Sequence, residues 1–175
     1  MPRNNPLQTI RALYRHSFSL DPAADAEYYR IVLPLLREPG IQNLDTYIQH
    51  SDITLLHHVI SVSYLTYRAC KRLGLDYEAG ARAGILHDFV TYDWHDPDPG
   101  HRLHGFRHPY FARANAKSIT ALSAVEENAI VRHMWPLTPI PPRYKEAWVL
   151  TIVDKYCAAK ETLRKYQKHP EDLVS

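Results

Sequence analysis

The residues between Asp52 and Leu73 repeat with the period of an α-helix, and a histidine takes part in their apolar stripe. The stripe has intervals of four, three, four and four residues and consists of His58, Val62, Leu65, Ala69 and Leu73. A stripe of this period is the face that a helix turns toward a core. His58 is therefore expected to point inward. The second stripe is expected to face solvent and contains His57, Ser61, Tyr64, Arg68 and Lys71.

Helical patterns separated by capping residues run along nearly the whole chain, and strand patterns are almost absent. Gly74 suits the C-cap of the helix that begins at Asp52, and Asp76 can cap the next one. Residues 123–126 read S-A-V-E, the pattern of a capping box. The expected helices cover residues 6–18, 23–40, 52–73 and 76–92. A further helix is expected to start at 108, and two more are expected at 123 to about 134 and at 143 to about 167. The predicted fold class is all-α.

Prolines and one polar segment mark the expected interruptions. Pro34 is expected to bend the second helix, and Pro39 with Gly40 to end it. Residues 93–107 are rich in Pro, Gly, Asp and His and are expected to form a loop, either a lid over a site or only a flexible connection. Proline tolerates the first turn of a helix, so His108 and Pro109 are expected to open the next one.

Composition limits the class of protein. With 175 residues, 45% of them hydrophobic, the chain can build one core, and a net charge of +2 gives no reason to expect long nucleic acid or a membrane as a partner. Cys70 and Cys157 lack metal-site or disulfide spacing and are expected to be buried thiols. The early apolar run at 31–36 is far shorter than the ~20 residues of a membrane span. We therefore expect a soluble, cytoplasmic protein.

Two carboxylates and a second histidine are also expected on inward faces. His87 and Asp88 are expected on the helix at 76–92, over small residues that allow close helix packing, and Asp154 shares a face with Leu150 and Cys157. A single inward histidine is more often a hydrogen-bonded core residue, and Asp154 alone could pair with an arginine.

Four such groups on three helices favour a metal instead. Burying an unpaired ion costs several kcal/mol, so each group needs a partner. Two imidazoles and two carboxylates suit a hard or borderline divalent cation. Adjacent residues such as His87 and Asp88 lie about 100° apart on a helix, and both can reach a site between them.

These residues resemble the H…HD…D signature of the HD-domain superfamily of metal-dependent phosphohydrolases. The resemblance rests on the run that begins at His57-His58, on the small-residue helix ending in His87-Asp88, and on the Asp154-Lys155 pair. It implies a single-domain helical bundle of the HD-domain type over residues 1–175, with leading helices at 1–51, an HD-type metal-binding core at 52–160, and the end of the last helix and a tail at 161–175. His58, His87, Asp88 and Asp154 are then the metal ligands.

The resemblance extends to a second cation. His108 and His133 resemble the additional histidines of the binuclear branches, with His104 as an alternative to His108; both could instead be ordinary helix-end residues. Asp88 would then bridge the two ions. The expected cofactor is one or two divalent transition-metal ions: Fe, Mn, Zn, Co or Ni, with Mg possible. The phosphodiesterase branch places a second histidine after His133, where this chain has Met134, which speaks against cyclic-dinucleotide cleavage.

The implied function is hydrolysis of a small phosphate ester or nucleotide. In this interpretation Asp88 is the catalytic, bridging carboxylate that orients metal-bound water. The candidates for binding the phosphorylated substrate are Lys155, Arg107, Arg132 and His104.

Two alternatives from other classes remain open. One is a di-iron HD-type oxygenase, and the other is a non-catalytic module that binds metal or nucleotide. Trp148 could contribute to a homodimer surface. Trp135 could stack on a base or could simply fill the core.

Overall fold

The computed structural model describes residues 25–50, 53–91 and 104–168. Its α-helices are α2 (Ala26–Leu36), α3 (Pro39–Gln42), α4 (Leu55–Leu73), α5 (Tyr77–Leu86), α6 (His104–Ile119), α7 (Ala124–Arg132) and α8 (Lys145–Lys168). The predicted all-α fold class, a single-domain helical bundle, is confirmed. The helix expected at 6–18 and the segment 93–103 of the expected loop lie outside the described residues.

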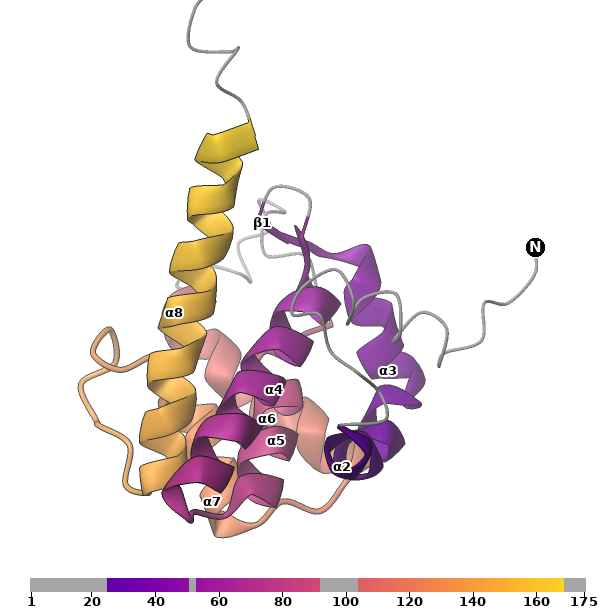
Figure 1. The fold of residues 1–175 in the computed structure, drawn as a ribbon, viewed down its shortest axis with the longest axis vertical. Coiled ribbons are helices and arrows are strands. Elements are labelled where there is room, and N and C mark those ends of the chain that lie inside the picture. Colours follow the sequence, from indigo (N-terminus) through magenta and orange to yellow (C-terminus); the bar gives the residue numbers. More distant parts are fainter. Residues whose placement is uncertain (1–24, 51–52, 92–103, 169–175) are drawn as a thin grey trace, which may run out of the picture.

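Helices α4 and α5 form the centre of the bundle. Both contact α8, and α5 also contacts α2 and α7. Figure 1 shows α8 standing along one side of α4, with its C-terminal end projecting past the other helices, and α2 and α3 on the opposite side. Among the described residues, none of the helices combines the length and apolar character that a membrane crossing requires.

Local sequence signals explain where the central helices begin and end. The side chain of Thr54 accepts a hydrogen bond from His57 N and caps α4, so that helix starts at Leu55. Gly74 adopts a left-handed conformation (φ 67°) at the end of α4, as predicted. Asp76 caps α5 through Ala79 N, and Ser123 with Glu126 forms the predicted capping box of α7.

A small antiparallel strand pair precedes α4 and was not anticipated from the sequence. Strands β1 (Ile48–His50) and β2 (Ile53–Thr54) pair Ile48 with Thr54 and His50 with Ile53. Between α3 and β1 lies a 3₁₀ helix, η1 (Asn43–Thr46). Strands this short carry no alternating pattern that a sequence could reveal.

Three predicted helix boundaries are wrong. Helix α5 ends at Leu86 instead of Tyr92, and α6 begins at His104 instead of His108, with Pro109 inside it. Pro109 is the sixth residue of α6, past the first turn, so the helix lacks one intrahelical backbone donor at this position. Pro39 does not end a helix but begins α3, since its fixed φ suits a first helical position.

The two predicted faces of α4 are also partly wrong. Leu73 is 62% exposed, whereas Ser61 and Tyr64, expected to face solvent, are 6% and 3% exposed. His57 is half-buried. Because α4 is covered by neighbours on several sides, its buried surface is wider than one stripe. Cys70 and Cys157 are buried and free, as expected.

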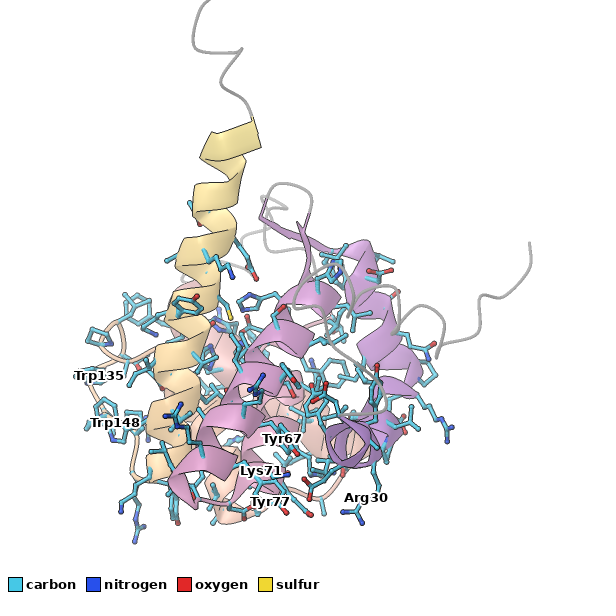
Figure 2. All side chains as sticks on the ribbon, in the orientation of Figure 1. Arg30, Tyr67, Lys71, Tyr77, Trp135 and Trp148 are labelled. Atoms are coloured by element: carbon cyan, nitrogen blue, oxygen red, sulfur yellow. The ribbon has the colours of Figure 1, made fainter. Side chains whose placement is uncertain are left out.

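Polar contacts attach α2 to the central helices. Tyr67 and Tyr77 donate to Glu27 at 2.6 and 3.1 Å, and Lys71 pairs with the same carboxylate. Figure 2 shows Tyr67, Lys71 and Tyr77 gathered beside α2. The hydrogen bond from Lys71 has the largest effect on the pKa of Glu27, and together with those from Tyr67 and Tyr77 it lowers this pKa to about 2.

Helices α4 and α5 touch at Gly84, which leaves no space for a side chain. A Cβ at this position would lie 2.3 Å from Ser63 Cα, a backbone atom. The predicted close approach of the small-residue helix is therefore confirmed.

We expect Gly84→Ala to lower the free energy of unfolding by about 3 kcal/mol, because the helices would have to separate. Gly80→Ala is the matched control on the same helix, since its Cβ would meet only side-chain atoms of Cys70 and Thr66 at 3.1 and 3.2 Å. Urea unfolding of both variants measures the effect. Equal stability of the two would contradict the proposed backbone contact.

Candidate metal centre

His87 and Asp88 lie in the turn that follows α5, not on the helix itself as expected. His87 is the C-cap of α5, and its Nδ1 lies 2.9 Å from Gly84 O. A carbonyl only accepts hydrogen bonds, so Nδ1 carries the proton and Nε2 presents its lone pair. Asp88 follows directly and is 8% exposed. His87 keeps helical dihedrals (φ −62°, ψ −34°), so the two adjacent side chains are directed as at a helix end and both reach the centre.

His133 repeats this arrangement at the end of α7. It is the C-cap of that helix, and its Nδ1 donates to Ile130 O at 2.8 Å. Its Nε2 atom lies 2.9 Å from His108 Nε2 of α6. Both rings are buried. Two imidazole nitrogens facing each other at this distance are close enough to bind one cation.

His58 is oriented by a residue that the sequence analysis missed. Its Nδ1 lies 2.9 Å from Glu161 Oε2, and its Nε2 lies 3.2 Å from Asp154 Oδ1. Glu161 is 7% exposed on α8. It continues the inward face of that helix, four residues after Cys157 and seven after Asp154, and this spacing was the signal that could have revealed it.

The three histidines therefore share one design. In each of them, Nδ1–H donates a hydrogen bond to an acceptor outside the centre, and Nε2 points toward the carboxylates. Histidines that bind metals are oriented in this way, because the outer hydrogen bond holds the tautomer and the ring direction.

The two oxygens of Asp88 face different groups of histidines. Oδ2 lies 3.5 Å from His87 Nε2 and 3.9 Å from His58 Nε2. Oδ1 lies 3.1 Å from His108 Nε2 and 3.4 Å from His133 Nε2. Each group of three offers donor atoms that lie within 4.8 Å of one another. The six predicted ligands are thus brought together, with Asp88 between two groups.

Asp154 completes the first group. Its Oδ1 lies 3.2 Å from His58 Nε2 and 3.6 Å from His87 Nε2. Ligands about 2.1 Å from a common cation lie roughly 3.0–3.4 Å apart, which is close to these separations. In the described part of the chain, the buried atoms His87 Nε2 and Asp88 Oδ1 make no well-directed hydrogen bond, although imidazole and carboxylate atoms lie 3.1–3.6 Å from them. Buried polar atoms without partners are costly, and a cation would compensate both.

The charged groups stabilise one another without a metal. Burial would raise the pKa of Asp88, but the imidazoles of His87, His108 and His133 outweigh it and hold this pKa well below its usual range. Burial would lower the pKa of His58, but Asp154 and Glu161 raise it well above the ordinary value. For His133, burial prevails and lowers the pKa. Imidazole and carboxylate donors without a thiolate suit a borderline or hard divalent cation, so these buried groups can hold a metal ion.

A cavity of about 630 Å³ opens onto the centre. Of the predicted substrate-binding residues whose side chains the structure describes, only Lys155 lines it, and its Nζ donates to His133 O at 2.8 Å. Arg107 is exposed and stacks over Phe111 at 5.3 Å, and Arg132 is half-buried; neither lines the cavity. The side chain of His104 lies outside the described residues.

Comparisons of the chain with protein-family models, with curated proteins and with solved structures found no match. The resemblance to the HD-domain superfamily therefore rests on the residues of this chain alone. Their geometry supports a metal centre independently of any relative.

Replacing Glu161 should weaken metal binding. We expect Glu161→Ala to lower metal affinity by about 10- to 100-fold, because His58 loses the acceptor that orients its ring. Glu161→Gln should lose less, since the amide oxygen can still accept from Nδ1. Competition with a chromophoric chelator measures the affinity. Glu146→Ala, on the same helix and next to Asp76, is the control; equal affinities of the two alanine variants would refute this role.

Metal binding should release protons. Burial lowers the pKa values of His58 and His87, but the carboxylates of Asp88, Asp154 and Glu161 outweigh burial and raise them. A cation must therefore displace protons that ordinary histidines would already have lost at neutral pH. Since these folded pKa values exceed the unfolded value of about 6.5, the two histidines stabilise the metal-free fold at low pH, and this contribution is lost as pH rises through the folded pKa.

We therefore expect metal affinity to increase between about pH 6 and pH 8. Calorimetric titration with Zn²⁺ in two buffers of different ionisation enthalpy measures the released protons. Identical heats in both buffers would show that no proton is displaced.

Proposed function

We propose that this protein is a metal-dependent phosphohydrolase of the HD-domain type that acts on a small phosphate ester. The observation that carries the proposal is the position of the Asp88 carboxylate, whose two oxygens face two separate pairs of imidazoles. A carboxylate shared in this way is suited to bridge two divalent cations. Two-cation centres are typical of enzymes that hydrolyse phosphate esters.

The residues of the chain have distinct parts in this proposal. His58, His87, Asp154 and Asp88 would hold one cation, and His108, His133 and Asp88 would hold the second. Divalent cations at such a site supply a water with a pKa lowered toward ~7 and positive charge beside a phosphoryl oxygen. Iron, manganese, zinc, cobalt and nickel all suit these donors.

Lys155 supports binding of the phosphate. It lines the cavity, and its side chain is 44% exposed. The hydrogen bond from Nζ to His133 O holds the ammonium group beside the second group of ligands, where it can pair with an anionic oxygen. Arg107 and Arg132 are not part of the proposed site, because neither lines the cavity.

The first test is elemental analysis of protein purified without added metal, followed by a phosphate-release screen over sugar phosphates, alkyl phosphates and nucleotides. We expect retained transition metal and release of inorganic phosphate. Asp88→Ala should lose the metal and lower turnover by more than about 100-fold, since the shared ligand serves both cations. Glu78→Gln, an exposed carboxylate on α5, should change neither property.

Other results would redirect the proposal. Full metal content and turnover in Asp88→Ala would refute the ligand assignment. Iron-dependent oxygen uptake without phosphate release would indicate the di-iron oxygenase instead. Tight nucleotide binding without any product would indicate a regulatory module.

A further inference from the structure

The cavity in front of the metal centre has apolar walls. Its lining away from the donor atoms is formed by Leu55, Val90, Met134, Pro136, Leu137 and Ala158. These residues come from the start of α4, the segment after α5, the segment after α7, and α8. A bound molecule would therefore meet ligand atoms and Lys155 at one end and hydrocarbon over the rest of its surface.

The charges of the cavity match one phosphate group. Lys155 is the sole Lys or Arg among the described lining residues. A phosphate monoester carries a charge of about −1.5 to −2 at neutral pH, which the centre and this one lysine can balance. The further phosphates of a polyphosphate chain would face apolar walls without a cation, and burying unpaired charge is costly.

The described part of the lining also lacks a platform for a nucleobase. Proteins commonly bind bases by stacking them on aromatic side chains, and the described lining contains no Phe, Tyr or Trp. Trp135, which could have stacked on a base, instead packs edge-on against Trp148, with ring centroids 4.9 Å apart, at the outer side of α8 (Figure 2).

One wall of the cavity is closed by a tight contact between α6 and the segment after α7. A Cβ on Gly105 would lie 2.9 Å from Leu137 Cδ2 and 3.7 Å from Met134 Cε. Leu137 lines the cavity and is still 48% exposed, which places it at the mouth. Its side chain thus offers apolar surface both to the cavity and to solvent.

We propose that the cavity accepts the phosphate monoester of an apolar alcohol, with the phosphate at the donor atoms and the hydrocarbon against the walls. This inference rests on the proposed phosphohydrolase function. Hydrolysis would form a bond from a water oxygen to phosphorus and break the bond from phosphorus to the alkyl oxygen. That oxygen takes a proton from the water, so the products are the alcohol and inorganic phosphate.

Binding of a homologous series tests the ligand class apart from turnover. Ethyl-, butyl- and hexylphosphonate cannot be hydrolysed at their carbon–phosphorus bond, and calorimetry with the full-length, metal-loaded protein gives their affinities. Burial of each added methylene should raise the affinity roughly fourfold until the cavity is filled. In parallel, release of phosphate from hexyl phosphate, glycerol phosphate and AMP reports turnover.

A matched pair of variants locates the apolar surface. Leu137→Arg should remove the dependence on chain length, lowering the affinity for hexylphosphonate about tenfold more than that for ethylphosphonate. Ile140→Arg is the control, because Ile140 is similarly exposed (53%) in the same segment but does not line the cavity. Met134→Gln provides a second, less disruptive change of the same wall and should act in the same direction.

The outcomes separate this inference from the function on which it rests. Equal affinity across the series, together with phosphate release from AMP or glycerol phosphate, would overturn the inference and leave the phosphohydrolase standing. Affinity that rises with chain length but is unaffected by Leu137→Arg would also overturn it. Affinity that rises and depends on Leu137, without phosphate release from any ester, would support the ligand class and refute hydrolysis.

Discussion

The carboxylate of Asp88 is the interaction on which the centre depends. It is buried between four imidazoles, and each of its oxygens faces a different pair of them. A buried carboxylate without compensation is unstable, so the fold must bring these rings together. The position of Asp88 follows from α5, which ends one residue before His87 and is held against α4 at Gly84, where the backbones leave no room for a side chain. The close contact of α4 and α5 at Gly84 therefore sets the position of the central ligand.

Helix ends determine the direction of two of the histidines. The last carbonyls of a helix lack partners within it, and His87 and His133 each use the carbonyl three residues earlier as the acceptor for Nδ1. This pairing satisfies the backbone and turns Nε2 toward the carboxylates in a single arrangement. His58 lies within the first turn of α4 and has no such carbonyl beside its ring, so Glu161 of α8 supplies the acceptor. Local geometry orients two rings, and a distant helix orients the third.

The centre and the cavity limit each other's chemistry. The donor atoms and Lys155 gather the polar groups at one end of the space, and the remaining walls are hydrocarbon. Apolar walls exclude water and strengthen electrostatic interactions at the centre. They also favour ligands with a single anionic group. The proposed reaction and the proposed ligand class therefore follow from the same separation of polar and apolar lining.

The sequence by itself determined the all-α class, most helix spans and the inward positions of His58, His87, Asp88 and Asp154, because helical periodicity and capping are local properties that residues a few positions apart reveal. His108 and His133 were predicted from the family resemblance. It did not reveal the turn at His87 and Asp88, since a helix end depends on what packs beyond it. Glu161 was missed because it is 103 positions away from His58 in the sequence. Its role exists only when α8 lies beside the start of α4. The same holds for the basic residues. The sequence gives no reason to prefer Lys155, Arg107 or Arg132 as the phosphate-binding residue. Only the packing of α6, α7 and α8 decides that Lys155 alone of the three lines the cavity. Side-chain direction across the bundle is a long-range property, and only the tertiary structure decides it.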